Sequence, residues 1–215
     1  MVVEITVRGE AEERYPAERA VVTLAASFED AAKQAVYDAA VATQQAITSQ
    51  ATELADRGAV SNWSSEQVAV SSYRPWLDGE KRGDVVHVAH VGISVEFVDF
   101  ARLSGFLDYW AGRDGVEISG IAWDVLERNR RNYESELRKV AVSNAVSKAQ
   151  AYADALRRGR VIPTRLADAG LLEGSGGPVP YAMKAEANLS DGRGVQLTPE
   201  PVLIRVAVDA GFTAE

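Results

Sequence analysis

Alternating apolar and polar residues predict two extended strands at the beginning of the chain. Residues 3–8 alternate up to Gly9, and residues 20–24 repeat the pattern after the polar turn 10–18. Successive side chains of a strand point to opposite faces of a sheet, so a period of two is typical of a half-buried strand. We expect these two strands to form an antiparallel pair.

Apolar residues spaced by three and four predict a long helix in the next segment. The expected buried face consists of Val36, Ala40, Thr43, Ile47, Ala51 and Leu54. A hydroxyl cap followed by acidic residues favours a helix start at residues 27–30. We expect the helix to end at Arg57 and Gly58, because glycine accepts the left-handed backbone that often terminates a helix.

A β-hairpin is expected from residues 66–73 and 85–97, and its connection 74–83 is rich in turn-forming residues. After the hairpin, Asp99 favours the start of a shorter helix. The apolar face of that helix holds Leu103, Leu107 and Trp110.

The next strand, over residues 116–126, changes its alternation near Gly120, which predicts a β-bulge. A second long helix is expected to begin at a cap on Asn132. Its expected buried face consists of Leu137, Ala141, Ala145, Ala149, Tyr152 and Leu156. A short strand within residues 163–172 and a closing strand over residues 202–208 complete the predicted elements.

The expected order is strand, strand, helix, strand, strand, helix, strand, helix, strand, strand. Long helices with small residues beside alternating strands favour the α+β class. We therefore expect an antiparallel sheet with two long helices and one shorter helix packed on one face. The whole chain, residues 1–215, is expected to form a single domain, with a flexible Gly- and Pro-rich loop at residues 173–198.

The composition excludes several function classes. The 215 residues include no cysteine and carry a formal net charge of −8. Disulfides, cysteine-ligated metals and thiol nucleophiles are therefore absent. A negative charge opposes general nucleic-acid binding, because the phosphate backbone attracts basic surfaces. The basic clusters at residues 128–131 and 157–160 lie beside helix ends and are interpreted mainly as solvated charge.

No apolar stretch approaches the ~20 residues that a membrane-spanning helix needs. The first residues read as a strand rather than as an export signal. We expect a cytoplasmic protein without a membrane span.

None of the familiar catalytic patterns is convincing. His87 and His90 are three residues apart on an expected strand, so their side chains point to opposite faces and cannot share one metal ion. The segment 174–177 contains a serine among glycines but lacks the surroundings of a serine nucleophile or a phosphate loop. We expect no catalytic residue, no cofactor and no metal ion.

The expected hairpin connection holds the most suggestive surface residues. Trp76 follows Pro75 at a position with little apolar surface nearby to cover it, and Arg74 lies two residues earlier. Exposed tryptophan and arginine are enriched at protein interfaces. We interpret Arg74 and Trp76 as candidate partner-binding residues, and packing of Trp76 back onto the domain is the alternative. Trp63, Trp110 and Trp123 are expected in the core or packed on the sheet.

Several motifs in the same order along the chain resemble the SIMPL-domain family. They are the strand Ile5 to Glu10, the turn and strand Pro16 to Leu24, the helix end at Gly58, the hairpin strand with Tyr73, Gly120 with Ile121, and the helical run Ala141 to Ala149. The resemblance implies an α+β fold and a poorly defined, non-enzymatic role. Members include bacterial periplasmic or surface-associated immunogenic proteins, some of them ring-like homo-oligomers, and an animal signalling adaptor that associates with a kinase.

Two functional hypotheses follow. The first is a non-enzymatic protein of the SIMPL type that acts by self-association or by binding a protein partner, most simply as a homo-oligomer. The second is a small-ligand binding module or hydrolase whose site lies under the loop 173–198 and includes His87.

Overall fold

The computed structural model describes residues 2–77, 81–172, 186–187 and 197–215. Antiparallel strands and three helices confirm the α+β class. The chain forms two compact units. Unit 1 comprises Met1–Pro16, Val125–Lys184 and Pro201–Glu215, and unit 2 comprises Ala17–Asp124 and Ala185–Glu200. The expectation of a single domain stays a prediction.

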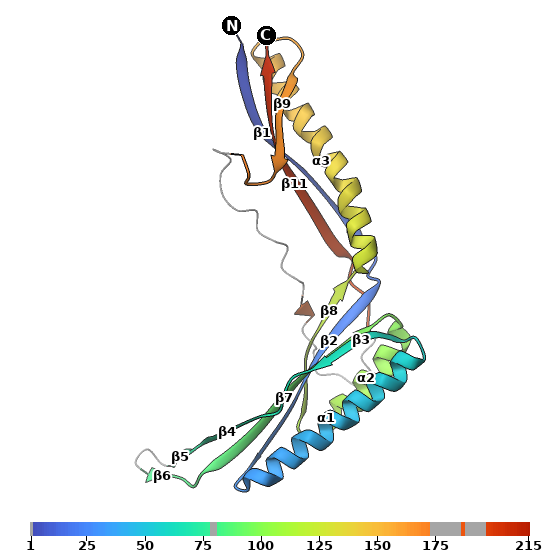
Figure 1. Ribbon diagram of the computed structural model, residues 1–215, viewed down its shortest axis with the longest axis vertical. Coiled ribbons are helices and arrows are strands. Elements are labelled where there is room, and N and C mark those ends of the chain that lie inside the picture. The colour runs from blue at the N-terminus through green and yellow to red at the C-terminus, as the bar shows by residue number, and fades with distance from the viewer. Residues whose placement is uncertain (1, 78–80, 173–185, 188–196) are drawn as a thin grey trace. The chain divides into compact units, whose positions relative to one another are not determined.

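Unit 1 is a three-stranded antiparallel sheet covered by one helix (Figure 1). Its elements are β1 (Val3–Tyr15), α3 (Glu127–Ala155), β9 (Ile162–Asp168) and β11 (Val202–Ala214). β11 is the central strand of the order β1-β11-β9. The expected pairing of the first two strands is wrong, because β1 pairs along its whole length with β11, from Val3 opposite Ala214 to Tyr15 opposite Val202.

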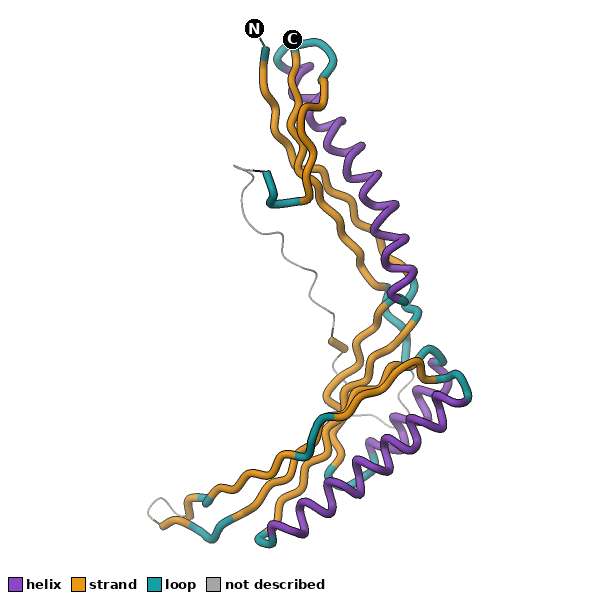
Figure 2. Tube along the Cα trace, in the orientation of Figure 1, coloured by secondary structure: helices purple, strands orange, loops and turns teal. Residues whose placement is uncertain are grey.

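Unit 2 is a larger antiparallel sheet with two helices on one face (Figure 2). Its elements are β2 (Arg19–Asp30), α1 (Lys33–Asp56), β3 (Val60–Ser65), β4 (Ala69–Tyr73), β5 (Trp76–Leu77), β6 (Lys81–Arg82), β7 (Val86–Phe97), α2 (Phe100–Ala111), β8 (Val116–Asp124) and β10 (Glu186–Ala187). The strand order is β10-β8-β2-β7-β3, and β4 also pairs with β7. The three helices are thus divided between two sheets.

The core of unit 2 forms where one face of the sheet meets α1 and α2. Alternate residues of β2, β7 and β8 are buried there together with the apolar stripes of both helices. The buried helix residues are Val36, Ala40, Ile47 and Ala51 of α1 and Leu103, Phe106, Leu107 and Trp110 of α2. The period of the sequence therefore identifies the helix faces that remove apolar surface from water.

The core of unit 1 depends on small residues. Ala141, Ala145, Ala149 and Ala153 of α3 are fully buried against β1 and β11. Gly9 of β1 lies directly under this stripe: a Cβ at Gly9 would collide with the carbonyl oxygen of Ala141 and lie 2.8 Å from the Cβ of Ala145. Glycine and alanine therefore allow α3 to approach the sheet closely.

Two predicted helix starts are wrong. β2 continues through Asp30, which pairs with His87, so α1 begins at Lys33 rather than at residues 27–30. α3 begins at Glu127, five residues before Asn132. In both places tertiary contacts override the local capping signal.

Other local signals are confirmed. The Asp99 side chain accepts hydrogen bonds from the backbone N–H groups of Ala101 and Arg102 at the start of α2. Gly58 has φ +75° after α1. The register of β2 with β8 shifts between Thr23, opposite Gly120, and Leu24, opposite Ile118, as the expected bulge requires.

Candidate functional site

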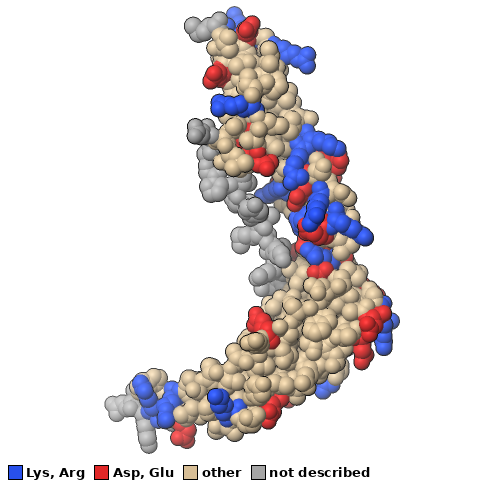
Figure 3. All heavy atoms as spheres, in the orientation of Figure 1, with Lys and Arg blue, Asp and Glu red and all other residues tan. Residues whose placement is uncertain are grey.

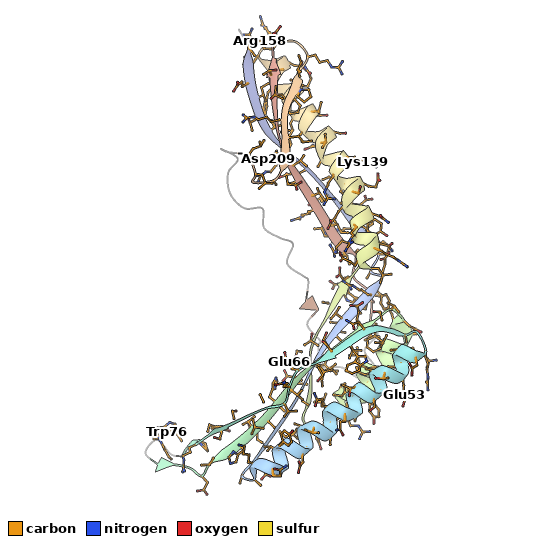
Figure 4. The ribbon with its side chains drawn as sticks, viewed as in Figure 1. Glu53, Glu66, Trp76, Lys139, Arg158 and Asp209 are labelled. Atoms are coloured by element: carbon orange, nitrogen blue, oxygen red, sulfur yellow. The ribbon has the colours of Figure 1, made fainter. Side chains whose placement is uncertain are left out.

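The predicted hairpin is present in unit 2, and its end is built by short strands. β4 pairs with β7, as expected from the sequence, and beyond this pair β5 and β6 form a two-residue ladder with Trp76 opposite Arg82. The N–H of Gly83 donates to the carbonyl oxygen of Pro75 at 2.8 Å. Figure 4 shows Trp76 at this end of the hairpin in unit 2.

Cross-strand pairing places Trp76 and Arg82 on the same face of the small ladder. The guanidinium carbon of Arg82 lies 5.1 Å from the centroid of the Trp76 ring. A cation over an aromatic face is attracted to the electrons of the ring. The Trp76 side chain nevertheless remains 65% exposed, because the described residues supply no apolar surface to cover it.

The pair lies at a hollow of about 310 Å³ that we call the tip pocket. Its lining side chains are polar, aromatic or basic, with one small apolar residue. They are Ser72, Tyr73, Arg74, Trp76, Arg82 and Val85. The described lining of the tip pocket therefore contains two guanidinium groups and two aromatic rings, and no acidic residue is among its described members.

Two further contacts orient the lining. Nη1 of Arg74 donates to the carbonyl oxygen of Gly83 at 3.4 Å, which is a long hydrogen bond. The hydroxyl of Tyr73 donates to Oε2 of Glu29 at 3.3 Å, and Glu29 belongs to β2, which lies on the other side of β7 from β4. Arg74 and Trp76, which the sequence singles out, thus share one pocket with the adjacent Tyr73, while Arg82 joins them through strand pairing.

The histidines are arranged as the sequence predicts. His87 is half-buried on β7, between Asp30 of β2 and Ser72 of β4, and His90 is exposed on the opposite face. Within the described ranges, no three His, Asp or Glu residues are placed to hold one metal ion. The expected loop 173–198 lies outside the described residues, except for β10 and the residues from 197 onward.

A buried ion pair in unit 1 is missed by sequence reasoning. Asp209 is only 1% exposed, and Arg8 approaches its Oδ1 with Nε at 2.8 Å. The N–H of Gly170 donates to Oδ2 of the same carboxylate at 2.7 Å. The hydrogen bond to Asp209 raises the pKa of Arg8. The pair joins β1, β11 and the turn after β9, so its role is structural (Figure 4).

A second polar network lies in unit 2. Arg19 contacts Oε2 of Glu96 at 2.9 Å and Oδ2 of Asp124 at 2.8 Å. Burial lowers the pKa of Arg19, but the hydrogen bonds to both carboxylates outweigh it and raise the pKa. This network joins β2, β7 and β8.

The first basic cluster forms part of α3 rather than a separate patch. Basic side chains are interspersed with acidic ones along this helix (Figure 3), and Arg131 pairs with Glu127 one turn earlier at 3.3 Å. Both side chains are mostly exposed, which agrees with the interpretation as solvated charge.

The three tryptophans outside the tip pocket differ in how deeply they are buried. Trp110 and Trp123 are buried. Nε1 of Trp110 donates to Oε1 of Gln50 at 2.7 Å, and Trp123 packs edge-on against Phe100. Trp63, in contrast, is 37% exposed on β3, so of its two expected places the core is excluded and packing on the sheet stays a prediction.

Comparison with known protein families supports the resemblance that the sequence motifs indicate. The SIMPL family, described as a protein of unknown function (DUF541), matches residues 5–212, so the chain belongs to this family. No curated protein matches the chain. Among the described helices, none has the length and apolar character that crossing a membrane requires.

Proposed function

We propose that this protein acts without catalysis, through protein–protein contacts. The contact that we propose is self-association through the tip pocket. The observation that carries the proposal is the exposed Trp76 ring, which lies beside the Arg82 guanidinium on the ladder of β5 and β6. Tryptophan supplies a large contact area with few internal rotations to restrict, and tryptophan and arginine dominate the energy of many interfaces.

The other polar groups of the described residues also support a non-catalytic role over a hydrolase. The carboxylates of Glu96, Asp124 and Asp209 are paired with Arg19 and Arg8, and neither cluster belongs to the described lining of the tip pocket. A hydrolase would require a nucleophile within hydrogen-bond reach of a base beside a pocket. Among the described residues that line it, the tip pocket offers Ser72 and Tyr73 hydroxyls but no histidine or carboxylate. Its chemistry therefore favours recognition over reaction.

Self-association is tested by measuring the mass of the intact protein with light scattering or analytical ultracentrifugation over a range of concentrations. We expect a mass above that of one chain, and we expect Trp76→Ala to weaken association by about 2 kcal/mol, which is about 30-fold. A strict monomer at high concentration would refute self-association, and unchanged assembly of Trp76→Ala would remove the tip pocket from it.

The chain offers a matched control. Tyr109 is a second exposed aromatic residue of unit 2, at 48%, and Arg113 lies over its ring with the guanidinium carbon 4.5 Å from the centroid. Tyr109→Ala removes the same kind of cation–aromatic pair outside the tip pocket. We expect it to leave the mass unchanged, so equal losses in both variants would indicate a general surface effect.

The expected cytoplasmic location belongs to the proposal as well. Fractionation of cells that express the full natural gene tests it directly, because an exported form would appear outside the cytoplasmic fraction.

A further inference from the structure

No acidic side chain that the structure describes is paired with either of the two guanidinium groups of the tip pocket. Among the residues that the structure describes, Arg82 makes its contact with the Trp76 ring and Arg74 makes only the long bond to the Gly83 carbonyl. An arginine side chain presents five N–H donors in a planar fork that matches the two oxygens of a carboxylate. Most donors of both residues are therefore available to a ligand.

The lining favours a carboxylate carried on a polypeptide. Trp76 and Tyr73 offer aromatic surface for the aliphatic part of an acidic side chain or for neighbouring backbone, and Ser72 adds a hydroxyl that can donate. A pocket lined by guanidinium groups and rings, open to solvent at the end of a hairpin, suits a protruding side chain better than a fully enclosed small molecule.

The charge of the chain suggests where that carboxylate comes from. Unit 2 contains about twice as many acidic as basic residues, whereas unit 1 contains slightly more basic ones. The tip pocket is thus a basic, aromatic site on the acidic unit. Contact between two acidic units is repulsive unless positive groups meet the negative surface of the other copy.

We infer that the tip pocket binds a carboxylate on an acidic segment of a second copy of this chain, with Arg74 and Arg82 as the donors and Trp76 as the stacking surface. This inference rests on the proposed function and names what the interface recognises. Charge-assisted bonds of this kind weaken with ionic strength when they are exposed, so the contact is salt-dependent.

The test uses the full chain and two probes that differ only in charge: an acetylated tetraglutamate peptide and its tetraglutamine counterpart. In calorimetric titrations we expect the glutamate peptide to bind more tightly than the glutamine peptide, and Arg82→Gln to weaken that binding about tenfold. Equal binding of the two peptides, or no binding of either, would overturn the carboxylate assignment. Tighter binding of inorganic phosphate than of the glutamate peptide would overturn it as well.

Matched variants distinguish peptide binding at the tip pocket from a general effect of positive surface charge. Arg113→Gln removes an arginine that also stacks on a ring but lies outside the pocket, and it should bind the glutamate peptide like the wild type. Arg74→Lys retains the charge but loses the planar fork, so it should weaken binding by a smaller factor than Arg82→Gln. An equal loss in Arg113→Gln would contradict a local site.

The sequence also places Asp78 and Glu80 between the two arginines, and these residues lie outside the described residues. The double variant Asp78→Asn and Glu80→Gln should bind the glutamate peptide at least as tightly as the wild type, because it removes negative charge near the site. Weaker binding would contradict the inference, since those acids would then belong to the binding surface.

Competition between the glutamate peptide and self-association tests whether the bound carboxylate belongs to a second copy. If the carboxylate belongs to a second copy, the glutamate peptide should shift the mass of the assembled protein toward that of one chain, and the glutamine peptide should not. A peptide that binds the pocket without reducing the mass would refute the second copy as the source. Assembly that depends on Trp76 while no peptide binds would sustain the proposed function and refute this inference.

Discussion

Gly9 is the residue at which α3 comes closest to the sheet of unit 1. No side chain larger than hydrogen fits there, because the carbonyl oxygen of Ala141 occupies the space that a Cβ would need. The motif that places glycine before Glu10 in β1 therefore serves packing, together with the alanine stripe of α3. Backbone atoms cannot move aside as a flexible side chain can.

Two glycine-to-alanine substitutions should have opposite effects for this reason. Gly9→Ala forces α3 away from β1, and we expect it to lower the free energy of unfolding by about 1–3 kcal/mol. Gly105→Ala in the exposed middle of α2 meets no atom within 4 Å, and it should raise the free energy of unfolding by about 0.5–1 kcal/mol. Denaturant titration measures both, and a stabilised Gly9→Ala would contradict the close packing.

At the residue scale, the sequence predicts most of the buried positions but not all of them. Leu137, Ala141 and Ala145 are buried as expected, whereas Tyr152 and Leu156 are more than half exposed. Ala149 is also buried as expected, and the buried line then continues by a step of four to Ala153 instead. A stripe with this step winds slowly around the helix, as packing on a twisted sheet requires, and local hydrophobicity does not reveal that drift.

At the scale of elements, two side chains of α3 bond to the backbone of strand β1. Oδ1 of Asn144 accepts from the N–H of Glu10 at 3.1 Å, and Nζ of Lys148 donates to the carbonyl oxygen of Arg8 at 2.9 Å. β1 lies at the edge of its sheet, so its outer backbone groups lack a strand partner. Covering an edge in this way hinders unwanted pairing with other chains.

Removal of the Asn144 side chain should expose one defined amide. In Asn144→Ala we expect the Glu10 amide to exchange its hydrogen about five times faster, which corresponds to a net hydrogen bond of about 1 kcal/mol. Ser143→Ala is the control, because the hydroxyl of Ser143 bonds to Lys139 within α3. Hydrogen exchange followed by NMR measures the rate, and equal rates in the wild type and Asn144→Ala would show that the bond does not protect the strand.

Element boundaries show where local signals fail. Asp99 caps α2 as predicted, because its carboxylate bonds to backbone groups only two and three residues away. The region around Ser27 looks equally suitable as a cap, yet it pairs with β7 on one side and β8 lies close on the other. Strand pairing satisfies more backbone groups than a cap does, so the sheet extends to Asp30.

At the scale of the whole molecule, the two units have separate hydrophobic clusters. The cluster formed by α3 with β1 and β11 belongs to unit 1, and the faces of α1 and α2 belong to unit 2. All four tryptophans lie in unit 2. Their fluorescence therefore reports on one unit, whereas far-ultraviolet circular dichroism reports on both.

This distribution makes the expectation of a single domain testable. If the chain unfolds as one cooperative domain, Gly9→Ala in unit 1 should lower the thermal midpoint seen by tryptophan fluorescence as much as the midpoint seen by circular dichroism. We expect the two shifts to agree. A fluorescence midpoint that stays at the wild-type value, while circular dichroism shows an earlier transition, would divide the chain into two independently stable domains.

Local sequence by itself determined the secondary structure class, the buried stripes of α1 and α2, the bulge near Gly120 and the candidate residues Arg74 and Trp76. These features depend on neighbours within a few residues, and periodicity, backbone preference and turn chemistry encode them directly. Tertiary structure alone decided that β1 pairs with β11, more than a hundred residues away, and that Arg82 joins Trp76 in one pocket. Such contacts depend on which strands meet in the folded chain, and no local pattern specifies a partner.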